Sequence, residues 1–255
     1  MKLTLQTLDE FPMIKPGDNL AEIIISKSRK QGIVPIDGDV FVLAQKIVSK
    51  AEGRLVNLAT VVPSTKAYEI AEITKKDPRF VEMVLRESRE VIRTAYNTLI
   101  VQHKKGFICA NAGIDHSNVK GDWGNELDWI LLLPEDPDHS AQLIRQKLEH
   151  VFKCSLGVLI IDSHGRAWRN GTEGTCIGLA GLPALVDLRG KEDLFGFKLK
   201  ITQVAAADEL AAAASLLMGQ ASEGTPVVFA HGFPYELRES SLDELIRPKE
   251  MDLFR

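Results

Sequence analysis

Two aspartates far apart in the chain each follow an apolar stretch, the position from which a side chain reaches a ligand at the edge of a sheet. Asp115 comes shortly after the run 107–110, and Asp162 directly follows Leu156–Ile161. Carboxylates that converge from separate strand ends suit Mg²⁺ or Mn²⁺, whose other ligands are phosphate oxygens and water. The alternative is that each aspartate caps a helix or closes a turn, and spacing alone leaves both interpretations open.

Three basic residues are candidates for holding phosphates. Lys50 lies just past an apolar run, where a fixed positive charge attracts a triphosphate, but an exposed lysine beside an acidic neighbour is the alternative. Arg166 and Arg169 suit paired hydrogen bonds to a phosphate or carboxylate. Their alternative is a solvated loop in which Trp168 is a local core anchor.

The common nucleotide-binding and hydrolytic motifs do not occur in the sequence. Neither G-x-x-x-x-G-K-[ST] nor G-x-G-x-x-G is present, which disfavours a P-loop and a standard dinucleotide fold. H-E-x-x-H and G-x-S-x-G are also missing, which disfavours a zinc enzyme and a nucleophile elbow. His116, His164 and His231 are therefore expected at the surface or in turns.

Hydrophobic patterning predicts the elements that position these residues. Val40–Ala44 and Leu156–Ile161 predict buried strands, the first followed by a polar binding loop and the second ending at Asp162. The glycine-rich segment 171–181 is predicted to be a turn region. Further strands are predicted at 3–8, 99–101, 107–110, 199–204 and 226–230. Capping residues and helical spacing predict helices after Asn19, after Ser64, from Asp77 with an apolar face reaching Val91, at 138–152 and at 208–218.

Composition indicates a globular chain that does not bind nucleic acid. With 255 residues, 45% hydrophobic and 26% charged, it can form one large domain or two intimately joined lobes. The formal charge of −4 lacks the basic excess needed to neutralise nucleic-acid phosphates. There is no signal-peptide pattern and no apolar run near the roughly 18 to 20 residues that cross a bilayer, so we expect a cytoplasmic protein without membrane contact.

Four motifs in a fixed order together resemble the coenzyme F420-0:gamma-glutamyl ligase family. They are Ser49–Arg54 (SKAEGR), Asn111–Asn118 (NAGIDHSN), Asp162–Arg166 (DSHGR) and Ala207–Gly219, which begins ADELA and ends LLMG. The resemblance runs from Phe11 to Gly232, and no single motif carries it.

This resemblance implies one ligase domain over residues 1–255, without the reductase-like domain fused to some members. The implied fold is α+β (mixed α/β), with mixed, largely antiparallel sheets, flanking helices and no P-loop, in an interlocked homodimer. The implied reaction uses GTP and two Mg²⁺ or Mn²⁺ ions, with K⁺ as a further candidate. The γ-phosphate passes to the lactyl carboxylate of coenzyme F420-0, and the amine of L-glutamate attacks the acyl phosphate.

Matched position by position, the resemblance implies two sets of site residues. Asp115 and Asp162 resemble ligands of the first metal, and Ser163 and Gln220 resemble ligands of the second. No general base is assigned. The positions that resemble GTP contacts are Phe11, Pro12, Met13, Ile14, Gln45, Lys46, Lys50, Asn118, Met218, Gly219, Gln220, Ala221, Ser222, Glu223, Gly224 and Thr225.

Three positions depart from the family pattern. Gln45 and Lys46 stand where members often have a small hydroxyl pair, and Ser163 replaces a commoner threonine while keeping the hydroxyl. Gln220 stands where some members have a metal-binding acid. A neutral amide is a weaker ligand for a hard cation, so the departures bear most on the second metal.

Two other functions remain as alternatives. One is a different carboxylate–amine ligase with the same acyl phosphate chemistry. The other is a nucleotide-binding module without turnover, against which the paired aspartates, Ser163 and Lys50 argue, since binding alone does not require paired metals.

Overall fold

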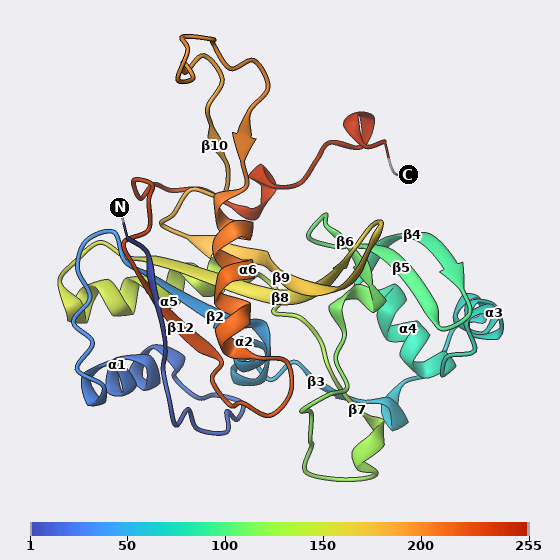
Figure 1. Ribbon diagram of the computed structural model, residues 1–255. Coiled ribbons are helices and arrows are strands. Elements are labelled where there is room, and N and C mark those ends of the chain that lie inside the picture. Colours follow the sequence, from blue (N-terminus) through green and yellow to red (C-terminus); the bar gives the residue numbers. More distant parts are fainter. Residues whose placement is uncertain (1, 254–255) are drawn as a thin grey trace.

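The chain folds as a mixed α/β protein with several mostly antiparallel sheets and flanking helices (Figure 1). The computed structural model describes residues 2–253. The α-helices are α1 (Leu20–Lys30), α2 (Gln45–Ala51), α3 (Thr65–Thr74), α4 (Pro78–Arg86), α5 (Pro137–Phe152) and α6 (Ala206–Met218). The strands are β1 (Thr4–Thr7), β2 (Val40–Ala44), β3 (Leu55–Asn57), β4 (Ser88–Ala95), β5 (Thr98–His103), β6 (Ile108–Ala110), β7 (Trp129–Leu131), β8 (Gly157–Arg166), β9 (Arg169–Ala180), β10 (Val186–Asp187), β11 (Gln203–Val204) and β12 (Val227–His231).

A five-stranded sheet with the order β1-β12-β2-β8-β9 forms the centre. Only β2 and β8 run parallel; the other neighbours pair antiparallel. Side chains alternate between the two faces of a strand, so Phe41 and Leu43 enter one hydrophobic core with α1 and α5, whereas Val40 and Val42 enter another with α6. Burial on both faces explains why β2 has a continuous apolar sequence.

A third core forms beside the central sheet. It joins α3, α4 and the three-stranded sheet β4-β5-β6, and it includes residues such as Phe80, Val84, Leu99 and Ile130 (Figure 1). The predicted caps are confirmed here: the Ser64 side chain accepts from Ala67 N, and the Asp77 side chain accepts from Arg79 N. None of the helices within residues 2–253 has the length and apolar character to span a membrane.

The glycine-rich segment is a strand, so the predicted turn region is wrong. A Cβ at Gly174 would lie 2.4 Å from the carbonyl oxygen of Ala211 in α6, and one at Gly178 would lie 2.5 Å from the carbonyl carbon of Pro137 in α5. These glycines therefore let helices approach both faces of β9 closely, and are not required by a turn. The side chain of Asp138 also holds β9, because its carboxylate accepts from Leu179 N at 2.8 Å and from Leu242 N at 3.0 Å.

Three other boundaries differ from the predictions. The expected polar loop after β2 is the helix α2, because Ile47 and Val48 turn into the core. The helix expected to extend to Val91 ends at Arg86, because the residues from Ser88 onward form β4 and pair with β5. The strand expected at 199–204 shrinks to β11, and the chain between β10 and β11 projects from the body as a long arm (Figure 1).

Replacing Asp138 tests whether its carboxylate acts as a clamp, that is, whether it holds two backbone segments together through Leu179 N and Leu242 N. We expect Asp138→Ala to lower the free energy of unfolding by about 2–4 kcal/mol, because two buried N–H groups lose their acceptor. Asp138→Asn keeps one acceptor and should lose less. Urea denaturation measures both, with the exposed Glu135→Ala as the control. An Asp138→Ala variant as stable as wild type would contradict the clamp.

Candidate active site

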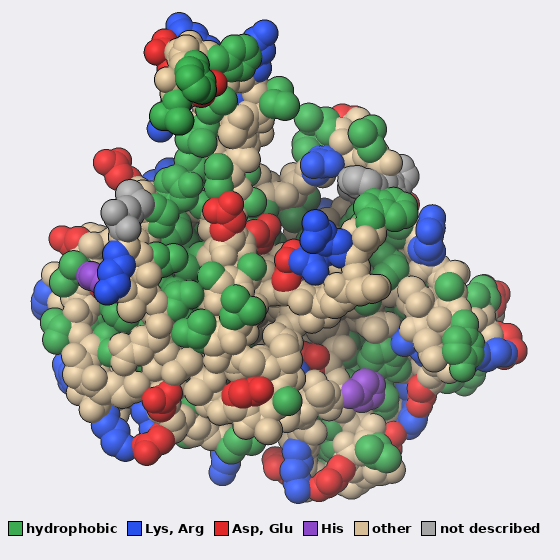
Figure 2. Space-filling view, in the orientation of Figure 1, with side chains coloured by type: hydrophobic (Ala, Val, Ile, Leu, Met, Phe, Trp, Pro, Cys, Tyr) green, Lys and Arg blue, Asp and Glu red, His purple; other side chains and the backbone are tan. Residues whose placement is uncertain are grey.

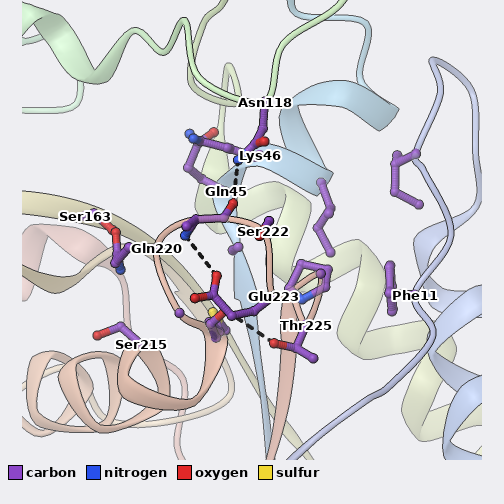
Figure 3. A pocket seen from close by; sticks show the side chains of 18 of the residues that line it. Phe11, Gln45, Lys46, Asn118, Ser163, Ser215, Gln220, Ser222, Glu223 and Thr225 are labelled. Carbon is purple, nitrogen blue, oxygen red and sulfur yellow. Dashed lines mark hydrogen bonds between the residues drawn. The ribbon is translucent and has the colours of Figure 1, made fainter.

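A cavity of about 370 Å³ lies where the loop after β1, the start of α2, the middle of β8 and the loop after α6 meet (Figure 3). All sixteen positions matched to GTP contacts line it, so the structure brings together segments that are up to about two hundred residues apart. Asp162, Ser163 and Gln220 of the expected metal ligands line it as well. Asp115 does not, but it contacts Gln45 and Lys46, which do.

A left-handed turn delivers Asp115 to this site. Asn111, Ala112 and Gly113 have φ values of 53°, 54° and 68°. A Cβ at Gly113 would lie 2.6 Å from a methyl carbon of Leu133, so the turn requires glycine at its last position. Paired backbone hydrogen bonds between Asp115 and Leu131, at 3.0 and 2.9 Å, then fix the backbone. Strained backbone of this kind commonly positions functional groups.

Asp162 lies inside β8, which continues to Arg166, so the predicted strand end is wrong. A β-bulge precedes it: Ile160 pairs with Gly178, whereas Ile161 pairs with Cys176. Bulges are common beside active sites, because the extra residue redirects the side chains that follow. The carboxylate of Asp162 accepts from Nε2 of His164 at 3.1 Å.

The environment of Asp115 disfavours the charged form of its carboxylate. Burial raises the pKa of Asp115 to about 6; the ammonium of Lys46 opposes this shift, and the negative charge of Asp162 adds to it. Lys46 Nζ lies 3.4 Å from Asp115 Oδ1, and its charge offsets the effect of burial only in part. A desolvated pair of acids fits a divalent cation, which removes the repulsion.

The set around Ser163 fits a second cation less well. Ser163 Oγ donates to Gln220 Oε1 at 2.8 Å, and both side chains are neutral and exposed (Figure 3). Within the described residues 2–253 no three acids, histidines or cysteines form a metal-binding group. A cation here would therefore depend on phosphate oxygens for most of its ligands.

Two lysines form the positive edge of the cavity. Lys46 Nζ donates to Ser117 Oγ at 2.8 Å, and Lys50 Nζ donates to the Asn118 carbonyl at 2.8 Å. Burial and the charge of Lys46 lower the pKa of Lys50. Asn118 Nδ2 donates in turn to the Ala221 carbonyl at 3.0 Å, which ties the two loops across the cavity.

The loop 218–225 forms the opposite wall. Gly219 and Gly224 have φ values of 70° and 69°, and a Cβ at Gly219 would lie 2.2 Å from the carboxyl carbon of Glu223. That carboxylate accepts from Ala221 N at 2.8 Å and folds the loop on itself. Thr225 Oγ1 donates back to the Met218 carbonyl at 3.2 Å, so the loop is closed at its base.

Several sequence expectations about this region fail. His164 was expected at the surface or in a turn, but only 8% of it is exposed. Trp168 is not a core anchor; it is 88% exposed where β8 turns into β9. Arg166 pairs with Glu173, and neither it nor Arg169 lines the cavity.

Sequence reasoning also missed Ser215, which lines the cavity and accepts from Gly174 N at 3.2 Å. Its position one helical turn before Met218 was the available signal, since residues at this spacing share a helix face.

Comparison with known proteins shows the family of the chain. Residues 9–232 match the family described as F420-0:Gamma-glutamyl ligase. The chain is 44% identical over 257 residues to the coenzyme F420:L-glutamate ligase of Methanothermobacter thermautotrophicus, covering 100% of both chains. It is 42% identical to the protein of that name from Methanocaldococcus jannaschii, and the match covers 96% of this chain and 94% of the relative. It is 40% identical to the protein of that name from Archaeoglobus fulgidus, and the match covers 100% of this chain and 97% of the relative. The chain therefore belongs to the F420-0:gamma-glutamyl ligase family.

Proposed function

We propose that this chain is an enzyme that joins L-glutamate to coenzyme F420-0, using GTP to activate the acceptor's carboxylate as an acyl phosphate. Membership of the ligase family supports the joining of glutamate to F420-0. The observation that carries the proposal is that Asp162, Lys46 and Lys50 line one cavity, while Asp115 contacts Lys46 and Gln45 in its lining.

The cavity has the features that a nucleoside triphosphate needs. Lys46 and Lys50 supply two positive charges from one helix, and both reach across to the loop 117–118. Phe11, Met13 and Ile14 give the cavity an apolar side for a base and ribose. We infer that the triphosphate lies along the lysine edge, toward Asp162.

Asp115 and Asp162 would hold the first of two Mg²⁺ or Mn²⁺ ions, and Ser163 with Gln220 would complete the second site; K⁺ remains a candidate further ion. When bound, such ions neutralise charge on the phosphates and polarise the transferred group. The fit is better at the first site, because burial raises the pKa of Asp115 and a cation bound there would stabilise its charged form.

The chemistry follows from charge and position. Lys46 and Lys50 hold the triphosphate so that the acceptor's carboxylate oxygen can attack the γ-phosphorus, which forms the acyl phosphate and releases GDP. The amine of glutamate then attacks the acyl carbon, phosphate leaves, and the nitrogen loses a proton to form the amide. A carboxylate is a poor electrophile until one oxygen becomes a phosphate leaving group, which explains the need for two steps.

We also propose that the enzyme is a homodimer whose second copy covers the arm between β10 and β11. In this arm Leu194 is 97% exposed, Phe195 is 94% exposed and Ile201 is 87% exposed. Figure 2 shows hydrophobic side chains gathered on the projecting arm. Apolar side chains gathered on a projecting segment are typical of an interface rather than of a free surface.

The ligase reaction can be tested with purified protein, F420-0, GTP, L-glutamate and Mn²⁺. We expect mass spectrometry to detect added glutamyl units with equivalent release of GDP. Asp162→Asn should lower the rate at least about 100-fold, because loss of a charged ligand removes several kcal/mol of transition-state stabilisation. Glu126→Gln, on an exposed acid away from the cavity, is the control and should retain full activity.

Two results would count against this function. Wild-type protein that binds GTP but neither releases GDP nor adds glutamate would indicate a binding module. Wild-type rates in Asp162→Asn would refute the role of that carboxylate.

The dimer can be tested by light scattering after size-exclusion chromatography. We expect wild-type protein to have twice the chain mass of 28.2 kDa. Phe195→Asp should shift it toward the monomer, because a charge would be buried in an apolar contact. Val62→Asp, another exposed apolar position, should leave the dimer intact. A monomeric wild type would overturn the proposal.

A further inference from the structure

Each of the two carboxylates has a buried hydrogen-bond partner beside it. Gln45 Nε2 donates to Asp115 Oδ2 at 2.6 Å, and His164 Nε2 lies 3.1 Å from Asp162 Oδ2. Only 1% of Gln45 and 8% of His164 are exposed. In both pairs this contact to one carboxylate oxygen restricts rotation of the acid and so directs its other oxygen, which at Asp115 is Oδ1, 3.4 Å from Lys46 Nζ.

Aromatic packing fixes the orientation of His164. Residues two apart on a strand share a face, so His164 stands beside Asp162 on β8. The ring of Phe107 packs against it with centroids 5.4 Å apart, and His103 also stacks on Phe107, with centroids 4.8 Å apart and 7° between planes. The three rings thus connect the β5-β6 hairpin to the acid in the central sheet.

A buried hydroxyl fixes the orientation of Gln45. Ser49 Oγ, one helical turn along α2, donates to Gln45 Oε1 at 2.9 Å, and Ser49 is fully buried. With its oxygen occupied in this way, the amide can only turn its NH₂ group toward Asp115. The side chain therefore has a definite role at the acid, although Gln45 also lines the cavity.

We propose that His164 and Gln45 are positioning residues that hold Asp162 and Asp115 in the orientation that binds the divalent cation. The proposal rests on the proposed function, since it assumes that these acids bind a metal. Hydrogen-bond donors that orient metal-binding side chains commonly determine the affinity for the metal, and their loss typically weakens metal binding about 10- to 100-fold. A purely structural role for the two residues would instead affect folding stability.

His164 can be tested by Mn²⁺ binding to the nucleotide-free protein, followed through the electron paramagnetic resonance signal of free Mn²⁺. We expect His164→Phe, which keeps a ring against Phe107 but removes the donor, to raise the Kd about 10- to 100-fold with an unchanged Tm of the metal-free protein. His164→Gln places an amide donor near the original Nε2 and should recover most of the affinity.

His103→Phe is the matched control. It makes the same substitution at the far end of the stack, where Nε2 has no partner among the described residues, and should leave Mn²⁺ affinity unchanged. Gln45→Met removes the other donor at similar volume and should weaken Mn²⁺ binding by a comparable factor.

The outcomes separate this proposal from the function on which it rests. If wild type binds Mn²⁺ and His164→Phe and Gln45→Met bind it equally well, the positioning role is wrong while the metal site stands. Loss of affinity in His164→Phe that His164→Gln does not recover, together with a lowered Tm, would also overturn it. Failure of the wild-type protein to bind Mn²⁺ would overturn the metal site and this proposal together.

Discussion

The burial of the Asp115 carboxylate near a second acid, Asp162, is the constraint on which the site depends. Asp115 and Asp162 come from different parts of the fold, and burial together with their mutual charge raises the pKa of Asp115 to about 6. Their arrangement costs free energy in the isolated chain, so the surrounding structure must hold them there. The left-handed turn 111–113, the bulge in β8 and the two buried donors supply that support.

The parts of the fold that local chemistry determines could be predicted from sequence. Ser64 and Asp77 cap their helices as expected, because a cap depends on residues within one turn. The order of motifs also indicated which residues gather at the cavity. That the segments 11–14, 45–50 and 218–225 line one cavity depends on strand order, with β12 between β1 and β2, and strand order has no local signature.

Errors occurred where tertiary packing outweighs local preference. The polar residues after β2 suggested a loop, but the burial of Ile47 and Val48 makes that segment helical. His164 has no distinctive spacing in the sequence, and its role depends on Phe107, more than fifty residues away. The glycines of β9 suggested turns because glycine serves both turns and close packing, and only the position of the neighbouring helix separates the two.

Gly174 has a consequence for how the cavity can vary among related proteins. It lets α6 rest directly on β9, and α6 leads straight into the loop 218–225. One methyl group at this position would lift the helix and carry that loop away from the lysines of α2. The width of the cavity is thus governed by a residue that does not line it, so evolution can resize the binding space without altering any side chain that touches the substrate.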